Sequence, residues 1–487
     1  MSIFTIPDIL HFKQDFTVSP ADKDKYGAIY TPFSLIQQML DLFPPAVFAD
    51  PTKTWLDLGA GHGYFAMLVF DRLNKGLAAQ MPEEHARKEH IVEKMLYLLE
   101  VQESNVAILR AMFGAKANIF SMDFLTTTTL PAITYDYIIG NPPYNAHGLK
   151  KVPTNTSRAK KADGTTVWAT FIERALLLLQ PTTGQLCFIV PVLWLKPDKN
   201  QLHQRLFTRT TLEKIHCLSS NETNTLFKGE AQTPTCFFLL TNTPPAPASG
   251  PAPPAPGPEP APAGPAPGQI LHLYDTQRQA YVPYRHRVGT PVPLFGAHLI
   301  QKVEPWLAKA GGALRVHKTN MPPKKSQFTQ TLFQPAYPYT NITTCVLEGL
   351  QPVLLLNYSD QPQAFHGQPK LVLAHKMYGF PYWDKDGHYG IANRDNYVIL
   401  QKTPTEFAQL AAFLSTKFVL YLYEAARYRM KYLEKYAFEF IPDVTRLPGF
   451  PLAPDISDET VADFFGLDAT DRAHIQRLHK KDYKRFL

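Results

Sequence analysis

The sequence has few cysteines and no long apolar run. Only four of its 487 residues are cysteine, and they stand singly, with no CxxC pair and no nearby histidine at metal-ligand spacing. We therefore predict buried free thiols, with no disulfide framework and no metal. No stretch approaches the roughly 18 apolar residues of a membrane span, and the first residues are too polar for a signal peptide. We expect an intracellular protein without a membrane segment.

Positive charge is scarce in the first part of the chain and in excess afterwards. The net charge is +7. Residues 1–149 carry 11 lysines and arginines against 16 acidic residues, whereas residues 150–242 carry 12 against 6 and residues 269–487 carry 26 against 19. This distribution favours a polyanion such as nucleic acid as the partner, although a solvated surface could show the same asymmetry by chance. The length predicts two or three domains.

The stretch from Tyr135 to Tyr144 joins an apolar, strand-like run to two prolines. Pro142 and Pro143 end any strand because proline has no N–H for the ladder. Ligands of open parallel sheets bind beyond the carboxyl ends of the strands, so Asn141 and Tyr144 would face a ligand. The stretch could equally be an ordinary turn, and its interpretation depends on the rest of the chain.

Residues 54–70 predict a strand, a glycine-rich turn and a helix. Gly59, Gly61 and Gly63 alternate as G-x-G-x-G. This spacing departs from the dinucleotide-binding fingerprint G-x-G-x-x-G, in which two residues separate the second glycine from the third. The glycines permit a tight turn, and the helix N-terminus offers unpaired N–H groups. Asp57 completes a D-x-G-x-G-x-G pattern that is typical of strands that bind S-adenosylmethionine, with the acid near the amino-acid part of the cofactor.

Two further acids follow predicted strands. Glu100 ends an apolar run at 95–99 and could accept both ribose hydroxyls of a nucleoside, with Glu103 as a weaker alternative. Asp123 follows a strand at 117–120 and could accept from an adenine amino group. Each acid alone is more often a solvated loop residue, but acids at three consecutive strand ends before Asn-Pro-Pro-Tyr indicate one cofactor site.

A helix is predicted over residues 33–40, with Thr31 as its N-cap and Pro32 at its start. Tyr30, Thr31 and Pro32 form a Tyr-Thr-Pro motif. The order of Tyr-Thr-Pro, the glycine-rich motif, Asn-Pro-Pro-Tyr and a carboxyl-terminal domain resembles an N6-adenine DNA methyltransferase of the gamma arrangement, found in type II restriction-modification systems. The resemblance covers roughly residues 17–242.

The resemblance implies an α/β fold: a Rossmann-like, S-adenosylmethionine-dependent methyltransferase domain with a mostly parallel sheet, followed by a mixed α+β target-recognition domain. It implies that the cofactor S-adenosylmethionine contacts Tyr30, Thr31, Asp57, Gly59, Gly61, Gly63, Glu100, Asp123 and Asn141. The Asn141 side chain and the Pro142 carbonyl would accept hydrogen bonds from N6 of an extruded adenine, and Tyr144 would stack on the base. Phe227 matches the position of a second stacking aromatic, although a core phenylalanine is equally compatible.

Residues 243–268 contain 12 prolines and a single charged residue, which predicts an extended spacer. Such a segment marks either a domain boundary or a long surface insertion. We prefer the boundary, which gives a catalytic domain at 1–242, a linker at 243–268 and a target-recognition domain at 269–487. In the last domain we expect strands at 352–357 and 369–375, a hairpin at 379–391 that turns at 386–387, and a helix over about 405–436.

Basic side chains beside the Asn-Pro-Pro-Tyr stretch and in the last domain are predicted to contact double-stranded DNA. These residues are Lys150, Lys151, Arg158, Lys160, Lys161, Lys376 and Arg394. We expect a monomer that acts on intracellular DNA, with a possible separate cognate restriction endonuclease.

Two other enzyme classes use related motifs. A release-factor glutamine methyltransferase and RNA base methyltransferases also carry Asn-Pro-Pro-Tyr or related tetrads. In those enzymes the extra domain typically precedes the cofactor strand, whereas here only about 50 residues precede the glycine motif and most of the chain follows Tyr144. A combined endonuclease-methyltransferase or a DNA-binding protein with an inactive catalytic fold is a further alternative. The order of the motifs favours DNA methylation.

Overall fold

The computed structural model of the chain describes residues 30–128, 133–146, 166–198, 201–229, 231–245, 268–320, 328–329, 332–348, 351–375, 381–394, 396–429 and 433–477. They form two compact units that divide between Gly289 and Thr290. No helix within these ranges is long and apolar enough to cross a membrane.

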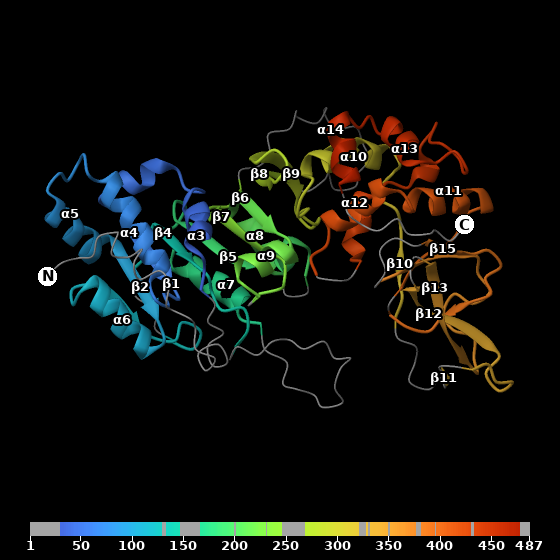
Figure 1. Cartoon of the computed structure of the whole chain (residues 1–487), viewed down its shortest axis with the longest axis horizontal. Helices are drawn as coiled ribbons and strands as arrows, with labels where there is room; N and C mark the ends of the chain where they lie inside the picture. Colours follow the sequence, from blue (N-terminus) through green and yellow to red (C-terminus); the bar gives the residue numbers. More distant parts are fainter. Residues whose placement is uncertain are drawn as a thin grey trace, which may run out of the picture. The chain divides into compact units, whose positions relative to one another are not determined.

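A nine-stranded sheet forms the centre of the first unit (Figure 1). Its strands are β1 (Trp55–Leu58), β2 (Leu96–Glu100), β3 (Asn118–Ser121), β4 (Tyr137–Gly140), β5 (Gln185–Pro191), β6 (Thr211–Leu218), β7 (Thr235–Thr241), β8 (Gly268–Asp275) and β9 (Ala280–Arg287). Their spatial order is β3-β2-β1-β4-β5-β7-β6-β8-β9. Strands β1 to β5 pair in parallel, β7 is antiparallel to both its neighbours, β8 is parallel to β6, and β9 is antiparallel to β8. The predicted mostly parallel sheet is confirmed.

Strands β1 and β4 are buried on both faces of the sheet. Trp55, Tyr137 and Ile139 belong to one hydrophobic cluster with residues of the flanking helices. The intervening residues Leu56 and Ile138 are also buried, as expected for parallel strands with helices on both sides. The helices of this unit are α3 (Phe33–Leu40), η2 (Pro45–Ala49), α4 (Tyr64–Gly76), α5 (Glu84–His90), η3 (Ile91–Met95), α6 (Glu103–Phe113), α7 (Trp168–Leu178), η5 (Val192–Leu195), α8 (Leu202–Arg209) and α9 (Ser220–Leu226).

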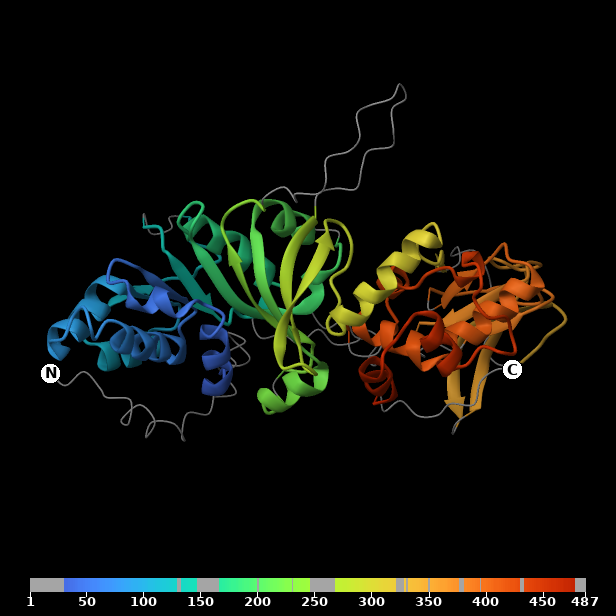
Figure 2. The same cartoon turned by 90° about the horizontal axis from the view of Figure 1, so that it is seen from above.

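The first unit extends further along the chain than the sequence predicts. Strands β8 and β9, assigned to the second domain above, form the edge of the first sheet, as Figure 2 shows in yellow-green beside the green strands. β8 pairs with β6 through Lys214↔His272 and Ile215↔Leu273. The domain boundary at 243–268 is therefore corrected to 289/290, because backbone pairing joins β8 to the first sheet. The proline-rich segment is an insertion between two strands of one sheet, and its residues 246–267 lie outside the described ranges.

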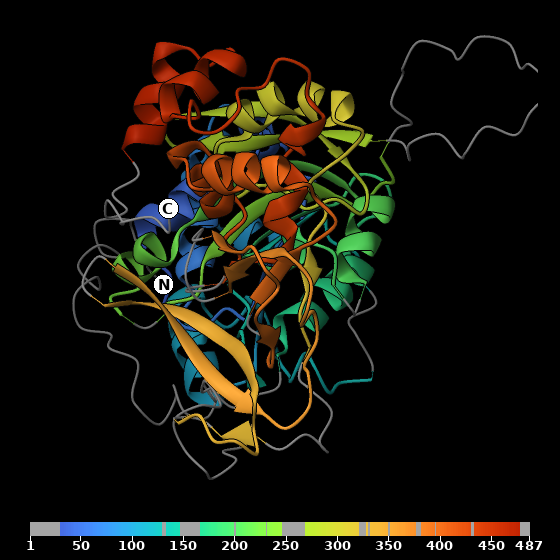
Figure 3. The ribbon, with the colours of Figure 1, turned by 90° about the vertical axis from the view of Figure 1, so that its right-hand side faces the viewer.

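The second unit is mixed α+β, as predicted. It contains a four-stranded sheet of order β10-β17-β14-β15 and another of order β11-β13-β12-β16. These strands are β10 (His317–Lys318), β11 (Phe328–Thr329), β12 (Tyr339–Glu348), β13 (Gln351–Ser359), β14 (Lys370–Ala374), β15 (Pro381–Asp384), β16 (Gly390–Ile391) and β17 (Asn396–Ile399). The strands expected at 352–357 and 369–375 are confirmed as β13 and β14. β12 and β13 form a long twisted ribbon (Figure 3).

Helices make up the rest of this unit. They are α10 (Ala297–Lys309), α11 (Pro404–Leu414), α12 (Lys417–Ala425), η6 (Lys435–Phe440), η7 (Val444–Arg446), α13 (Asp458–Phe464) and α14 (Ala469–Gln476). The single helix predicted over about 405–436 is wrong, because α11 and α12 are separate and α12 ends at Ala425. The Thr416 side chain accepts from the Val419 N–H and so caps a new helix.

The hairpin predicted at 379–391 is also wrong. β15 pairs with β14, whereas β16 pairs with β12 in the other sheet. The reason lies in Asp384, whose carboxylate accepts from the backbone N–H groups of His388 and Tyr389 at 2.9 and 3.0 Å. These bonds curl the chain after β15 and send it to a different sheet.

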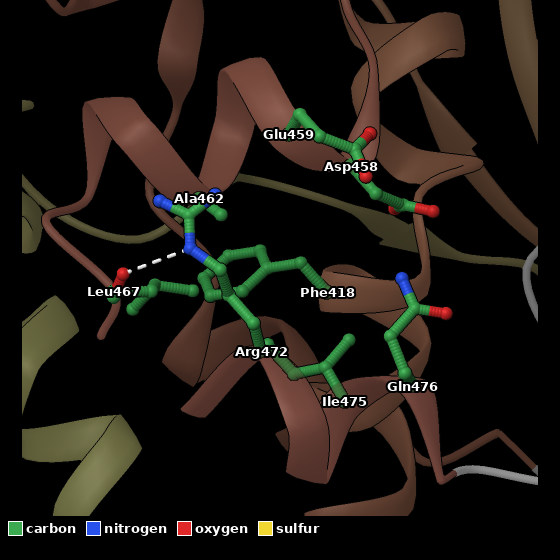
Figure 4. Close-up of a pocket in the computed structure, with 8 residues that line it drawn as sticks. All are labelled: Phe418, Asp458, Glu459, Ala462, Leu467, Arg472, Ile475 and Gln476. Atoms are coloured by element: carbon green, nitrogen blue, oxygen red, sulfur yellow. Dashed lines mark hydrogen bonds between the residues drawn. The ribbon is translucent and has the colours of Figure 1, made fainter. Parts of the chain in front are cut away.

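A small pocket of about 110 Å³ lies in the second unit (Figure 4). Its lining includes Phe418, Leu467 and Ile475, and Arg472 donates from Nε to the Leu467 carbonyl at 3.1 Å. This pocket contains none of the motif residues, which lie in the first unit.

Candidate active site

The glycine turn follows β1 and leads into α4. Gly59, Gly61 and Gly63 all have positive φ values, of 82°, 54° and 80°, which only glycine adopts readily. A Cβ at Gly59 or Gly61 would meet no atom within 4 Å, so these positions face open space. A Cβ at Gly63 would approach Leu109 Cδ2 to 2.8 Å, because α6 packs against this point. The backbone at Gly59 and Gly61 is therefore accessible, whereas Gly63 packs against α6.

Asp57 lies under this turn and is 1% exposed. Its Oδ2 accepts from the Ala66 N–H at 3.0 Å and so caps the first turn of α4. Its Oδ1 is buried and has no hydrogen-bond partner within the described part of the chain. Burial, with a smaller contribution from the negative Glu100, raises the pKa of Asp57 to about 8. One Asp57 oxygen is therefore bound to α4, and the other is not engaged by the described part of the chain.

Glu100 ends β2 next to the glycine turn. Its Oε2 accepts from the Gly61 N–H at 2.7 Å, and its Oε1 accepts from the Gln102 N–H at 2.8 Å. The carboxylate therefore holds the turn in place and keeps further lone pairs for a ligand. Val101, which follows it, is 42% exposed. Sequence reasoning missed Val101, whose signal is an apolar residue directly after a strand-end acid.

Asp123 is exposed and lies at the start of a turn after β3. Its two oxygens accept from the Leu125 N–H and the Thr126 hydroxyl, both at 2.9 Å. Asp57 lies near the end of β1, Glu100 ends β2 and Asp123 follows β3, so the three acids lie at the carboxyl ends of neighbouring strands, as the sequence predicts. Asp123 differs from Asp57 because both of its oxygens already bind the local chain.

Asn141 follows the last residue of β4, beside β1 in the sheet. Its Nδ2 donates to Thr31 Oγ1 at 3.0 Å. Its Oδ1 is buried and accepts no hydrogen bond from the described residues. The side-chain amide is therefore held with its donor bound to the protein and its acceptor available. Pro142 is buried directly after it.

Thr31 does not cap α3, contrary to the sequence prediction. Pro32 occupies the N-cap position without a side-chain cap. The Thr31 hydroxyl instead receives the Asn141 amide, and Thr31 is 4% exposed.

Tyr144 is half-buried, and its hydroxyl lies in the interior without a hydrogen-bond partner in the described ranges. Burial raises the pKa of this phenol well above its usual value, so it stays neutral. Its carbonyl accepts from the Val167 N–H at 3.1 Å, which fixes the loop backbone. The hydroxyl end of the Tyr144 side chain is therefore buried, while part of the residue's surface remains exposed.

Aromatic side chains surround the outer side of the glycine turn. The Tyr30 hydroxyl lies 2.6 Å from His62 Nε2, and the two ring centroids are 4.6 Å apart. Tyr64 packs against Tyr30 and Phe33, at 5.4 and 5.0 Å between centroids. Sequence reasoning missed His62 and Tyr64. The available signal was an imidazole between two glycines of the turn.

Phe227 belongs to the hydrophobic core of the first unit and is 3% exposed. The structure therefore favours the core interpretation of this residue over the stacking one.

The predicted DNA contacts fall mostly outside the described ranges. Lys150, Lys151, Arg158, Lys160, Lys161 and Lys376 all do so. Arg394 is exposed in the loop between β16 and β17. Asn396 ties this loop to β12 by donating to the Thr343 carbonyl at 3.1 Å.

The described residues contain no group of three or more His, Cys, Asp or Glu side chains that could hold a metal. Cys187, Cys236 and Cys345 are buried and Cys217 is half-buried, and all four are free thiols.

Known proteins are similar in sequence to the part of the chain that contains these residues. Residues 54–223 match the Eco57I restriction-modification methylase family. The matched residues include Asp57, Glu100, Asn141 and Tyr144, and the match begins after Thr31. A Mycoplasma pneumoniae protein described as an uncharacterized adenine-specific methylase is 36% identical over 85 residues, which are 17% of this chain and 20% of that protein. These two matches confirm the resemblance to adenine-specific restriction-modification methylases.

Solved structures resemble the chain more distantly. A type I restriction-modification methyltransferase subunit from Streptococcus thermophilus has a TM-score of 0.33 at 15% identity, over 50% of this chain and 46% of that one. The type IIL restriction-modification enzyme MmeI, solved in complex with DNA, has a TM-score of 0.45 at 12% identity, over 85% of this chain and 68% of MmeI. The chain thus spans a fifth of the curated relative and less than half of the Streptococcus subunit.

Proposed function

We propose that this protein is a site-specific DNA methyltransferase that transfers the methyl group of S-adenosylmethionine to N6 of adenine. The observation that carries the proposal is the Asn141 amide, whose Nδ2 is bound to Thr31 and whose buried Oδ1 has no partner in the described part of the chain. An acceptor held at a strand end beside a glycine turn suits a substrate that carries an amino group.

The residues around the glycine turn fit S-adenosylmethionine. Open space beside Gly59 and Gly61 allows a ligand to approach the backbone closely. The Asp57 Oδ1 could accept from the cofactor's amino group, and the Glu100 carboxylate could accept from ribose hydroxyls. The exposed Val101 side chain could pack against the flat adenine ring. Asp123 remains the proposed acceptor for the adenine amino group. When bound, the cofactor supplies the methyl group.

Side-chain and backbone groups of the protein would make the adenine amine a better nucleophile. The amine is a poor nucleophile because its lone pair is delocalised into the ring. Asn141 Oδ1 and the Pro142 carbonyl would accept hydrogen bonds from its two N–H groups, which favours a localised lone pair. Tyr144 would stack on the base, worth roughly 1–3 kcal/mol. Because N6 is paired and stacked in a duplex, the base must first be extruded. Catalysis then rests on positioning and fixed dipoles.

Three findings support DNA as the substrate class over a protein glutamine or RNA. The segment 54–223 matches a restriction-modification methylase family. The curated relative is described as adenine-specific. The chain after residue 149 carries excess positive charge, which suits a phosphate backbone. An intracellular location, a monomeric state and a separate cognate endonuclease stay predictions.

The test is transfer of a labelled methyl group to unmethylated DNA, followed by digestion to nucleosides. The wild-type chain should produce N6-methyl-2′-deoxyadenosine. Asn141→Ala should lower the rate by at least about 100-fold, because the acceptor for the amine is lost, while S-adenosylmethionine binding measured by calorimetry changes little. Asn224→Ala, exposed on α9, serves as the matched control. Label found only in protein or RNA, or full activity of Asn141→Ala, would refute the proposal.

A further inference from the structure

Two consecutive residues contact the two halves of the candidate site. Tyr30 contacts His62, which lies on the glycine turn, through a 2.6 Å hydroxyl-to-Nε2 distance. Thr31 accepts the Nδ2 hydrogen bond of Asn141, which lies on the loop after β4, at 3.0 Å. The glycine turn and the Asn141 loop follow neighbouring strands β1 and β4. One peptide unit therefore links the proposed cofactor turn to the proposed catalytic amide.

This dipeptide is held firmly from its carboxyl side. Pro32 follows it at the start of α3, and its carbonyl accepts from the N–H groups of Leu35 and Ile36. The α3 residues Leu35, Ile36, Met39 and Leu40 are fully buried. Thr31 itself is 4% exposed. Because Thr31 is already fixed in place, its side chain loses little conformational entropy when it binds Asn141.

The orientation of an amide decides which atom meets the substrate. An asparagine turned by 180° about its last bond exchanges an acceptor for a donor. With Nδ2 bound to Thr31, Oδ1 is the atom that remains for the substrate amine. With the opposite orientation, an N–H would face an amine hydrogen, and no hydrogen bond would form. The hydrogen bond from Nδ2 to Thr31 Oγ1 is the contact that accompanies the productive orientation in the structure.

We propose that Thr31 is a positioning residue that keeps Asn141 Oδ1 turned toward the target amine, and that Tyr30 couples this orientation to the glycine turn through His62. This inference rests on the proposed function, since it assigns roles within the same site. It differs from the sequence prediction that Thr31 serves as a cofactor contact. A cofactor contact would act mainly on cofactor affinity, whereas a positioning residue acts on the rate of transfer.

The test compares Thr31→Val with Thr31→Ser. Valine keeps the shape and removes the acceptor, whereas serine keeps the hydroxyl. Thr31→Val should lower kcat roughly tenfold, the effect of one hydrogen bond, with KM and the calorimetric Kd for S-adenosylmethionine nearly unchanged. Thr31→Ser should restore most of kcat. Thr208→Val, exposed on α8, is the matched control and should behave as wild type. A rise in the cofactor Kd that accounts for the whole loss, or no loss of kcat, would overturn the proposal.

Tyr30→Phe tests the coupling. It removes the hydroxyl that reaches His62 and keeps the ring. If the two residues act as one unit, the Tyr30→Phe/Thr31→Val double variant should be no slower than Thr31→Val alone. Losses that multiply would show that Tyr30 and Thr31 act independently and would contradict the coupling.

A readout without turnover separates this proposal from the proposed function. In protein labelled with ¹⁵N-asparagine, the Asn141 side-chain amide signal is assigned by its loss in Asn141→Ala. Its hydrogen exchange should be slow in the wild type and in Thr31→Ser and faster in Thr31→Val. If the wild type methylates no DNA, the proposed function fails, and this measurement still decides whether Thr31 holds the amide. Equal exchange rates in all three proteins would refute the positioning role.

Discussion

At the scale of residues, the candidate site depends on which oxygen of each polar side chain is already bound. Asp57 uses Oδ2 to cap α4, and its Oδ1 remains buried without a partner among the described residues. Asn141 is bound through Nδ2 and keeps Oδ1 available. Asp123 uses both oxygens in its own turn. Residue types alone could not distinguish these cases, because hydrogen bonds from distant segments assign the atoms.

Asp57 predicts a specific dependence of stability on pH. Burial raises its pKa to about 8, far above the value of 3.8 of an unfolded chain. Between these values the folded state binds one proton more than the unfolded state, so this group makes the free energy of unfolding fall as pH rises from about 4 to 8. One proton corresponds to at most about 1.4 kcal/mol per pH unit.

Asp57→Asn removes this titration and should flatten the dependence. Urea unfolding of both proteins at several pH values between 4 and 8 measures the difference. The wild type should lose stability relative to Asp57→Asn as pH rises. A parallel course of the two curves would show that Asp57 is already ionised in the folded protein.

At the scale of elements, apolar runs predicted strands and helices well, whereas their ends depended on side-chain hydrogen bonds. The runs at 55–58, 96–100 and 137–140 are strands, as predicted. Thr416 starts a new helix where the apolar pattern alone suggested continuity. Asp384 binds the His388 and Tyr389 N–H groups and turns the chain after β15, where an Asp-Gly pair suggested a hairpin. In each case a single polar side chain outweighed the local pattern.

Asp384→Ala should destabilise the second unit strongly. Asp384 is 3% exposed and accepts from Lys370, which is fully buried, at 2.6 Å. Removal of one partner leaves a buried charge without compensation, which costs about 3–5 kcal/mol. Chemical unfolding followed by circular dichroism measures the change. Asp386→Ala, exposed in the same turn, is the control and should stay within about 0.5 kcal/mol of the wild type. Similar stabilities of the two variants would argue against this role of the ion pair.

At the scale of the whole molecule, the main difference from the sequence prediction is the extent of the first unit. The proline-rich segment connects β7 to β8 within one sheet. Thr241 at the end of β7 pairs with Thr211 at the start of β6, and Gln269 near the start of β8 accepts from the Leu212 N–H. The two ends of the segment therefore lie about two strand spacings apart, roughly 10 Å.

A much shorter connection should therefore be sufficient. Replacement of residues 246–267 by about six glycine and serine residues should change the free energy of unfolding by less than about 1 kcal/mol, since loop closure depends weakly on length. S-adenosylmethionine binding should also be retained. Thermal unfolding and calorimetry measure both. Loss of folding after the replacement would show that the segment contributes more than a connection between β7 and β8.

The motif residues, their order and the strand ends that carry them follow from the amino-acid sequence alone. It also determined the α/β class of the first unit, because parallel strands buried on both faces have long apolar runs. Local periodicity and capping residues encode such features within a few residues of each other.

Three features became visible only in the folded chain: Phe227 lies in the core, β8 and β9 complete the first sheet, and Thr31 binds Asn141 instead of capping α3. Each of these contacts joins segments far apart in the sequence, up to 110 residues for Thr31 and Asn141. Their energies depend on which surfaces meet after folding, so no local pattern specifies them.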